Sequence, residues 1–321
     1  MYKTRISIAM ATYNGSKFLF EQLESFSKQT RQPDELVVCD DGSTDQTLEI
    51  LYKFQKDAPF DVKIFENSEN LGVGGNFAKA LSHCSGDILF MSDQDDYWFE
   101  NKLERIQDIL TRNSRIQVIC NDQINARENL SHEGVSRLAR RRARGYRDET
   151  FATGCCTAIR KDWLKFTLPF GVRGFDIWTN RLAYLAGAWQ LLDEPLQFYR
   201  RHGENVSPGV GAEVEKINKK DKPQRAHRSN EETIALWERE IQFNKAYAER
   251  LEKIAMEAPD YSSAANASAG RLRRKSEVLQ ERMNLIKEPI RKRPARLIKM
   301  IGKGKYNKFN GLKSAIGDLV R

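Results

Sequence analysis

The sequence has no long apolar run. A membrane-spanning helix needs about 20 consecutive, mostly apolar residues, and no stretch of the 321 residues comes near that length. Charged residues make up 30% of the chain, and the mean hydropathy is −0.63. Residues 1–11 also lack the apolar stretch and the small-residue cleavage site of a signal peptide. These absences argue against an integral membrane protein and make the cytoplasm the expected compartment.

Cysteine is scarce and is not arranged for metal binding or for disulfides. The five cysteines form no CxxC pair, and their number is odd. Both facts argue against a zinc site and against a disulfide framework. We therefore expect reduced, mostly buried thiols, including the adjacent Cys155 and Cys156.

The first two thirds of the chain have no excess of positive charge, although the whole chain has a net charge of +9. Residues 1–210 carry 27 basic and 29 acidic side chains, whereas residues 211–321 carry 26 and 15. The positive excess therefore belongs to the C-terminal part. Such an asymmetry indicates an anionic partner for that part, either a nucleic acid or an anionic membrane surface.

Apolar, strand-like runs alternate with helical patterns over the first 120 residues. The expected strands are 5–11, 35–39, 62–66, 87–91 and 117–120, and the expected helices are 17–29, 45–56, 73–84 and 101–113. This alternation predicts an α/β domain with a mostly parallel sheet covered by helices. In such sheets, ligands bind beyond the C-terminal ends of the strands.

The rest of the chain divides into parts of different composition. Residues 122–150 form a polar excursion rich in arginine, which is typical of a functional or a disordered loop. An ordered pattern then completes a domain over 1–208. Residues 209–228 have the composition of a linker, and residues 229–321 are predicted to be helical and basic. Within 151–208, a helix is expected over 176–186 and short strands over 189–192 and 196–199.

Two adjacent carboxylates, Asp40 and Asp41, directly follow the apolar run 36–39. A glycine turn comes next, and Asp45 suits the N-cap of the following helix. A strand-to-helix turn accounts for residues 42–45, but it does not account for two acids just after a buried strand. Carboxylates in that place can accept hydrogen bonds from a base edge or from a ribose hydroxyl.

A second acidic cluster, Ser92–Asp96, follows the strand expected over 87–91. Its three carboxylates repel one another unless a cation lies among them. Hard oxygen ligands at this density suit Mg²⁺ or Mn²⁺, with a diphosphate completing the coordination shell. The alternative is a solvated acidic turn, because a short acidic motif also occurs by chance.

Taken together, these motifs resemble the family 2 glycosyltransferases, whose fold is the GT-A nucleotide-diphospho-sugar transferase fold. The resemblance covers about residues 5–208. The matching segments are TYNG at 12–15, DDGSTD at 40–45, NLGVGGNF at 70–77, SDQDDYW at 92–98 and YRRHGENVS at 199–207. The DQDDxW form and the YRxHG ending look most like a rhamnosyltransferase-like branch, which uses dTDP-rhamnose to build bacterial surface polysaccharides such as O-antigen.

The resemblance implies a nucleotide-binding role for the matching residues near three strand ends. Asp41 and Tyr13, together with the backbone of Ala11 and Thr12, would hold the pyrimidine and the ribose. Asp93, the first acid of the second cluster, would approach the nucleotide.

The resemblance also implies a metal and diphosphate site. Asp95 would bind Mg²⁺ or Mn²⁺, and His202 would complete the metal–diphosphate site. Asp96 would contact the donor sugar or support the site. Arg200 or Arg201 would contact the diphosphate through charge-assisted hydrogen bonds.

In this family branch, the general base is an acidic residue at the start of a helix, in the pattern His/Glu-Asp-x-Trp. Asp176 and Trp178 match that pattern, whereas Phe175 departs from it and cannot hydrogen-bond the acceptor or tune the base. We predict that Asp176 is the base; it would also serve as a helix N-cap. Trp178 and Gly154 would lie on the acceptor side.

The resemblance thus implies an inverting, metal-dependent glycosyltransferase. Asp176 would take the proton of an acceptor hydroxyl while the oxygen attacks the anomeric carbon from the face opposite the diphosphate. The donor would be a nucleotide-diphospho-sugar, either dTDP-rhamnose or a UDP-hexose, and the acceptor a saccharide, lipid-linked or free. The arginines between residues 137 and 147 would either grip a lipid-linked diphosphate or belong to a solvated loop.

The C-terminal stretch 290–321 mixes Lys and Arg with apolar residues such as Leu297 and Ile298. This mixture is typical of an interfacial anchor, and we expect peripheral contact with the inner face of the cell membrane. A homodimer contact is the alternative. Two other hypotheses are a catalytically silent module that binds a nucleotide-sugar and a nucleic-acid-binding protein. Nucleic acid is not expected, because the tail has little aromatic interleaving and no recognition motif.

Overall fold

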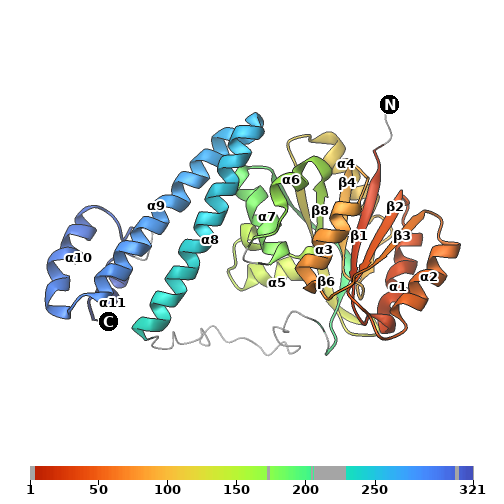
Figure 1. Ribbon diagram of the computed structural model, residues 1–321, viewed down its shortest axis with the longest axis horizontal. Coiled ribbons are helices and arrows are strands. Elements are labelled where there is room, and N and C mark those ends of the chain that lie inside the picture. The colour runs from red at the N-terminus through yellow and green to blue at the C-terminus, as the bar shows by residue number, and fades with distance from the viewer. Residues whose placement is uncertain (1–3, 172–173, 204, 206–228, 308–310, 321) are drawn as a thin grey trace. The chain divides into compact units, whose positions relative to one another are not determined.

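The computed structural model describes residues 4–171, 174–203, 205, 229–307 and 311–320 (Figure 1). The chain forms two units. The first contains residues 1–209 and the short segment 258–261, and the second contains the remaining residues. The predicted linker 209–228 lies outside the described residues.

The first unit is built on a mixed sheet, which has nine strands among the residues described. The strands are β1 (Ile6–Thr12), β2 (Glu35–Asp40), β3 (Asp61–Glu66), β4 (Ile88–Ser92), β5 (Tyr97–Trp98), β6 (Val118–Ala126), β7 (His132–Ser136), β8 (Thr157–Arg160) and β9 (Trp189–Arg200). Their order is β3-β2-β1-β4-β8-β6-β9-β5, with β7 paired to β6. Strands β1 to β4, β6 and β9 run one way, and β5, β7 and β8 run the other.

Helices cover this sheet. They are α1 (Ser16–Ser27), α2 (Thr47–Asp57), α3 (Gly72–His83), α4 (Lys102–Arg112), α5 (Arg137–Ala143), α6 (Leu164–Thr167) and α7 (Phe175–Ala186). Alternate side chains of β1, such as Ile6 and Ile8, join a core with Leu23 of α1 and Leu103 of α4. Helix α3 packs against β1 and β2. The expected α/β fold with a mostly parallel, helix-flanked sheet is confirmed.

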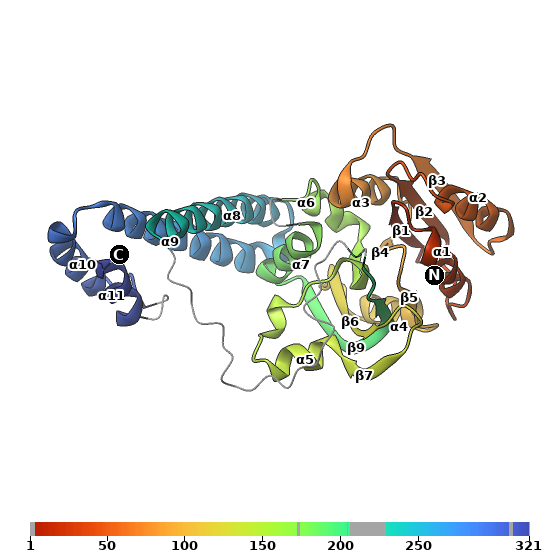
Figure 2. The same cartoon turned by 90° about the horizontal axis from the view of Figure 1, so that it is seen from below.

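The polar excursion expected over 122–150 is more ordered than its composition suggests. Strand β6 continues to Ala126, and β7 and α5 follow. Figure 2 shows β6, β7 and β9 side by side, with α5 after β7. Only Leu138 of α5 is buried, so the segment has no apolar periodicity that could have revealed it.

Strand β9 is continuous where two short strands were expected. It passes through Pro195, which has no N–H for a ladder hydrogen bond. The pairing of β6 with β9 shifts register on either side of Asp122, the residue opposite Pro195. This irregularity lets the strand accommodate the proline.

The second unit is helical, as predicted. Its helices are α8 (Asn230–Glu257), α9 (Ser262–Lys287), α10 (Arg293–Gly302) and α11 (Leu312–Val320). Ser229 and Glu232 form a capping box at the start of α8: the Glu232 N–H donates to Ser229 Oγ, and the Ser229 N–H donates to the Glu232 carboxylate. The helical run is interrupted between α9 and α10, at Pro289.

Two expectations about the whole chain can be compared with the structure. All five cysteines are free and buried, as predicted. Of the helices in the described ranges, none combines the length and the apolar character needed to cross a membrane.

Glu35 anchors the start of β2 through a buried carboxylate. Its oxygens accept hydrogen bonds from Ser7 Oγ (2.6 Å), from the Ser85 N–H and Oγ (2.5 and 2.9 Å) and from Lys63 Nζ (2.6 Å). Burial alone would raise the pKa of Glu35, but these hydrogen bonds outweigh it and lower the pKa to about 2. The ionised carboxylate therefore ties together β1, β2, β3 and the turn before β4.

Glu35→Gln is expected to make the free energy of unfolding less dependent on pH in the acid range. The pKa of about 2 in the folded protein lies below the ordinary value of 4.5, so this stabilisation is present above pH 4.5 and is lost as the pH falls toward 2. Over that window, the free energy of unfolding of the wild type should fall by about 3 kcal/mol more than that of the variant. Urea unfolding at stepped pH measures this. The exposed Glu69→Gln is the matched control, and parallel curves for the wild type and Glu35→Gln would contradict the prediction.

Candidate active site

The three polar signatures lie together because their strands are neighbours. In the sheet register, Thr12 of β1 is opposite Asp40 of β2, and Met10 is opposite Ser92 of β4. All three strands run in the same direction, so their C-terminal ends meet at one edge. Thr12 Oγ1 donates to Asp40 Oδ2 at 2.7 Å, which joins the first two signatures directly.

The two adjacent acids at the end of β2, Asp40 and Asp41, have different hydrogen-bond partners. Asp40 is buried, and its carboxylate accepts hydrogen bonds from the N–H and the hydroxyl of Ser43, which shapes the turn. Asp41 Oδ1 accepts from Asn67 Nδ2 and from the Leu71 N–H, each at 2.8 Å. Asp41, the predicted nucleotide-binding residue, is therefore held in place by the segment between β3 and α3.

Tyr13 combines a fixed backbone with an exposed ring. Its N–H donates to Gln94 Oε1 (2.9 Å), and its carbonyl accepts from Gln94 Nε2 (3.0 Å). The ring is part of a residue that is 51% exposed. Next to it, the Thr12 carbonyl accepts from the Asp41 N–H at 2.9 Å, and Ala11 precedes Thr12 in the same strand end. Sequence reasoning missed Gln94, because a glutamine inside an acidic motif has no recognised role.

Asp95 and His202 are in direct contact. His202 Nε2 lies 2.7 Å from Asp95 Oδ2, and both side chains are largely buried. Asn205 Nδ2 donates to the same Asp95 oxygen at 3.2 Å. The end of β9 and the loop after β4 thus bring together the two residues that were predicted to hold a metal.

Asp93 and Asp96 form a second grouping with Cys155. One potential ligand atom from each lies within 4.8 Å of the others. Burial, with the neighbouring Asp95 carboxylate, raises the pKa of Asp93 to about 7 and raises the pKa of Asp96 well above its ordinary range. Cys155 is a poor ligand for Mg²⁺ or Mn²⁺, which prefer oxygen. The acids therefore offer oxygen ligands close to Asp95.

A buried lysine, Lys102, supports the acidic loop, residues 93–96, from the protein interior. Lys102 Nζ donates to Gln197 Oε1 and to the Cys155 carbonyl (2.9 Å), and it lies 3.7 Å from the Trp98 ring centroid. Gln197 Nε2 in turn donates to Asp96 Oδ2 at 2.7 Å. Burial lowers the pKa of Lys102 to about 8. Nothing in the sequence distinguished this lysine from a surface residue at a helix start.

Arg200 points into the protein. Its Nε donates to the Asp95 carbonyl (2.9 Å), and its other nitrogens bond to the Glu21 carboxylate (2.7 Å) and the Glu128 carbonyl. The residue is 1% exposed, so its guanidinium braces the acidic loop. Arg201 donates its N–H to the Ala126 carbonyl, and its guanidinium carbon lies 5.6 Å from the Tyr199 ring centroid.

Asp176 lies in the first turn of α7. The N-cap is Gly174, which has a φ of 85°, so the cap role considered for Asp176 is not the one observed. Asp176 Oδ1 accepts from the Ile177 N–H at 2.8 Å. Burial raises the pKa of Asp176, and the hydrogen bond from the Ile177 N–H and the positive charge of Arg137 partly oppose that shift. A carboxylate with a raised pKa is a stronger base than an ordinary one.

The residues on either side of Asp176 are closely packed. Phe175 stacks on Phe77 with ring centroids 4.6 Å apart, and a Cβ on Gly154 would come within 2.4 Å of the Phe175 ring. Trp178 is buried and donates its indole N–H to the Thr167 carbonyl at 2.9 Å. Gly154 thus lies beside the start of α7, whereas the Trp178 ring belongs to the core.

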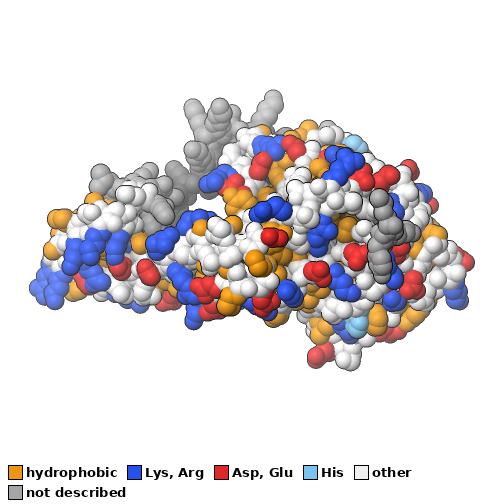
Figure 3. Space-filling model, turned by 90° about the horizontal axis from the view of Figure 1, so that it is seen from above, with side chains coloured by type: hydrophobic (Ala, Val, Ile, Leu, Met, Phe, Trp, Pro, Cys, Tyr) orange, Lys and Arg blue, Asp and Glu red, His pale blue; other side chains and the backbone are white. Residues whose placement is uncertain are grey.

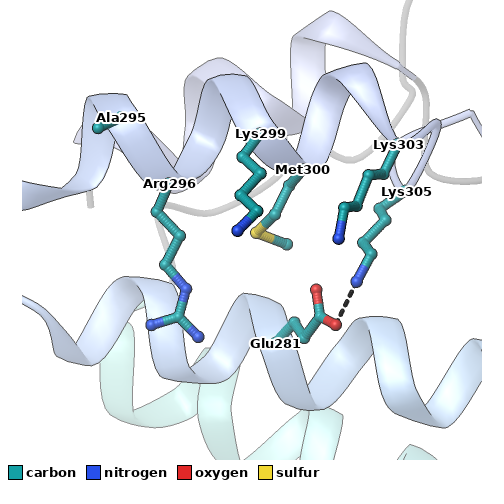
Figure 4. Close-up of a pocket in the computed structure, with 7 residues that line it drawn as sticks. All are labelled: Glu281, Ala295, Arg296, Lys299, Met300, Lys303 and Lys305. Atoms are coloured by element: carbon teal, nitrogen blue, oxygen red, sulfur yellow. Dashed lines mark hydrogen bonds and ion pairs between the residues drawn. The ribbon is translucent and has the colours of Figure 1, made fainter.

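The second unit has a separate basic pocket of about 510 Å³ between α9 and α10 (Figure 4). Its lining residues are Glu281, Ala295, Arg296, Lys299, Met300, Lys303 and Lys305. Lys305 pairs with Glu281, whereas Lys299 and Lys303 have no ion pair among the described residues. Figure 3 shows Lys and Arg side chains gathered on the visible face of this unit.

The sheet and its acid-bearing strand ends define an α/β domain of the GT-A type. The family model for glycosyl transferase family 2 matches residues 7–167, half of the chain, and the chain belongs to this family. The protein is therefore a family 2 glycosyltransferase, as the sequence motifs predicted.

Two relatives illustrate the range of the family. An uncharacterized glycosyltransferase of Nostoc sp. is 26% identical over 214 residues, which are 63% of this chain and 66% of the relative. A dTDP-rhamnosyl transferase of Shigella flexneri is 29% identical over 222 residues, which are 64% of this chain and 74% of the relative. The chain spans slightly less than two thirds of the Nostoc protein.

A solved structure has the same fold. S. aureus TarS in complex with UDP is similar with a TM-score of 0.52 and 17% sequence identity, over 91% of this chain and 78% of TarS.

Proposed function

We propose that this glycosyltransferase is an inverting, metal-dependent enzyme that transfers a sugar from a nucleotide-diphospho-sugar to a saccharide hydroxyl in bacterial surface polysaccharide synthesis. The observation that carries the proposal is the contact between Asp95 and His202 at the edge where the three signatures meet. An oxygen and a nitrogen ligand 2.7 Å apart, with further carboxylates nearby, fit Mg²⁺ or Mn²⁺. A bound divalent cation would neutralise charge on the leaving diphosphate.

The donor would lie along the strand ends. Asp41 and Tyr13 would hold the pyrimidine and ribose, with the backbone of Ala11 and Thr12 beside them. Asp93 would approach the nucleotide. Because the contacts described for Arg200 are all to protein groups, we assign it to bracing Asp95 and retain Arg201 as the candidate for diphosphate contact.

Asp176 would perform the chemistry at the acceptor. Its carboxylate would take the proton from the attacking hydroxyl, and its raised pKa favours that transfer. One carboxylate at the reacting centre is enough, because a diphosphate leaves without protonation; a glycoside hydrolase needs a second one. Asp96, which accepts a hydrogen bond from Gln197, would support the site from the protein interior.

Among donors, dTDP-rhamnose is supported by the Shigella flexneri relative, which is named as a dTDP-rhamnosyl transferase. A UDP-hexose is the second candidate, because TarS, which has the same fold, is solved with UDP. Both are pyrimidine nucleotides, so either donor suits the proposed roles of Asp41 and Tyr13.

For the second unit, we propose contact with an anionic membrane surface on the cytoplasmic side. The basic pocket supplies Lys299 and Lys303, and Ile298, which precedes Lys299 on α10, is 70% exposed. Cationic groups beside an exposed apolar side chain suit the boundary between lipid headgroups and acyl chains. A dimer contact through the same surface is the alternative.

Asp95→Ala is expected to weaken manganese-dependent binding of dTDP or UDP about 10- to 100-fold or more, because it removes a proposed metal ligand. Calorimetry with and without manganese measures this, and Asp87→Ala, outside the site, is the matched control. Binding equal to that of the wild type would remove Asp95 from the metal site. If the wild type binds neither nucleotide, the proposed donor class is wrong.

Asp176→Asn should keep nucleotide binding and lose turnover. The amide cannot accept the hydroxyl proton, so kcat should fall by roughly 10²- to 10⁴-fold. The readout is release of the nucleoside diphosphate in the presence of acceptor, compared with calorimetric binding of the nucleotide. Turnover at the wild-type rate would assign the base to another residue.

The double variant Lys299→Gln, Lys303→Gln should bind vesicles containing phosphatidylglycerol more weakly. At about 1 kcal/mol per lysine near the surface, the loss is roughly 30-fold. Lys245→Gln, Lys253→Gln on α8 removes the same charge elsewhere and is the control. Co-sedimentation measures binding. Equal loss in both double variants would leave the pocket without a specific role, and unchanged binding together with a smaller oligomer would favour the dimer contact.

A further inference from the structure

Arg137 and Arg141 of α5 differ from Arg142 of the same helix in their partners among the described residues. Arg142 pairs with Asp148 and Asp193. Arg137 and Arg141 have no carboxylate partner among the described residues. Both guanidinium groups bond instead to threonines of the following segment.

Those bonds hold the two guanidinium groups at one place. Arg137 donates to Thr153 Oγ1. Arg141 donates to the carbonyl and the hydroxyl of Thr150, at 3.1 and 2.7 Å. The guanidinium carbons lie 5.3 Å and 5.9 Å from the centroid of the same ring, that of the buried Phe151.

This arrangement is costly without an anion. Both side chains are half-buried, and burial, together with the neighbouring charge of Arg137, lowers the pKa of Arg141. Two like charges that have lost part of their hydration repel each other. An anion placed between them would relieve that repulsion and would accept the guanidinium hydrogens that point away from the threonines. Arginine pairs of this kind suit phosphate oxygens, which they can bind with two parallel hydrogen bonds.

Arg137 links the pair to the candidate base. Thr153, which Arg137 contacts, directly precedes Gly154, and Gly154 abuts the first residue of α7. The charge of Arg137 acts on Asp176, the next residue of that helix. On the other side, Cys155 lies with Asp93 and Asp96. The two arginines therefore contact the segment that leads into Gly154 and Cys155. Gly154 lies beside the start of α7, and Cys155 lies beside the acidic cluster.

We propose that Arg137 and Arg141 form a binding site for a phosphate or diphosphate group of the acceptor. The inference rests on the proposed function in one respect, the assignment of Asp176 as the base that marks the acceptor side. It narrows the acceptor class to saccharides joined to a phosphate or diphosphate, whether on a lipid carrier or free. The diphosphate would be fixed by the arginines while the hydroxyl of the attached sugar faces Asp176.

The test uses the full-length protein, saturated with dTDP or UDP and manganese so that the donor site is filled. Farnesyl diphosphate and inorganic pyrophosphate serve as probes, and farnesol as the probe without phosphate. Arg137→Gln and Arg141→Gln should each weaken farnesyl diphosphate binding about tenfold, consistent with loss of charge-assisted hydrogen bonds. Arg144→Gln, an exposed arginine at the end of the same helix, is the matched control and should bind like the wild type. Arg137→Lys, which keeps the charge but not the paired donors, should be intermediate.

The probes separate the two sources of phosphate. Tight binding of farnesyl diphosphate with weak binding of pyrophosphate indicates a lipid-linked acceptor, and similar binding of both indicates recognition of the phosphate group alone. Absence of binding by the wild type, equal binding by the wild type and both Gln variants, or an equal loss in Arg144→Gln would overturn the proposal. So would weaker dTDP or UDP binding by Arg137→Gln, since the pair would then serve the donor.

Failure of this inference can be told from failure of the proposed function. Nucleotide binding with manganese but no binding of the diphosphate probe would leave the transferase proposal standing and remove the acceptor site. Arginine-dependent probe binding without any nucleotide binding would support the phosphate site and refute the proposed donor class. Circular dichroism and thermal unfolding of the Gln variants confirm that the altered binding is not a loss of folding.

Discussion

The acidic loop of this enzyme depends on the chain of hydrogen bonds from Lys102 through Gln197 to Asp96. Asp96 is fully buried, and a carboxylate without partners in that position would be strongly disfavoured. Gln197 satisfies one of its oxygens, and the buried ammonium group of Lys102 fixes the orientation of the Gln197 amide. Breaking such a buried polar chain leaves an unsatisfied group and typically costs several kcal/mol. The neighbours of Asp96 in the motif take their positions from this anchor.

Arg200 completes the support from the other side. It comes from the last position of β9 and joins the Asp95 backbone to Glu21 on α1. These hydrogen bonds hold the acidic residues 93–96 close to one another. In the proposed mechanism, carboxylates fixed in this way would reduce the reorganisation required during the reaction.

The features that follow local patterns were predictable from the sequence. Strands β1, β2 and β4 have apolar runs, and parallel strands bring the acids that follow them to one edge. The position of Asp41 and of the Asp93–Asp96 cluster at the same edge of the sheet could therefore be foreseen. The burial of Lys102 could not, because a lysine in the first turn of a helix is normally solvated and its partners come from β9 and from the segment before β8. The inward direction of Arg200 was missed for a similar reason, since Glu21 and Glu128 are far from it in sequence.

The exposed ring of Tyr13 has a consequence for how the enzyme can change over evolution. The Gln94 amide clamps the backbone of Tyr13 on both sides, while the ring extends into solvent. An aromatic face stacks on any base, so in its proposed role Tyr13 would supply affinity without selecting between thymine and uracil. Under the proposed function, a change from one pyrimidine donor to another would need alterations only at the rim of the site, while the clamp, the sheet and the acidic loop stay as they are.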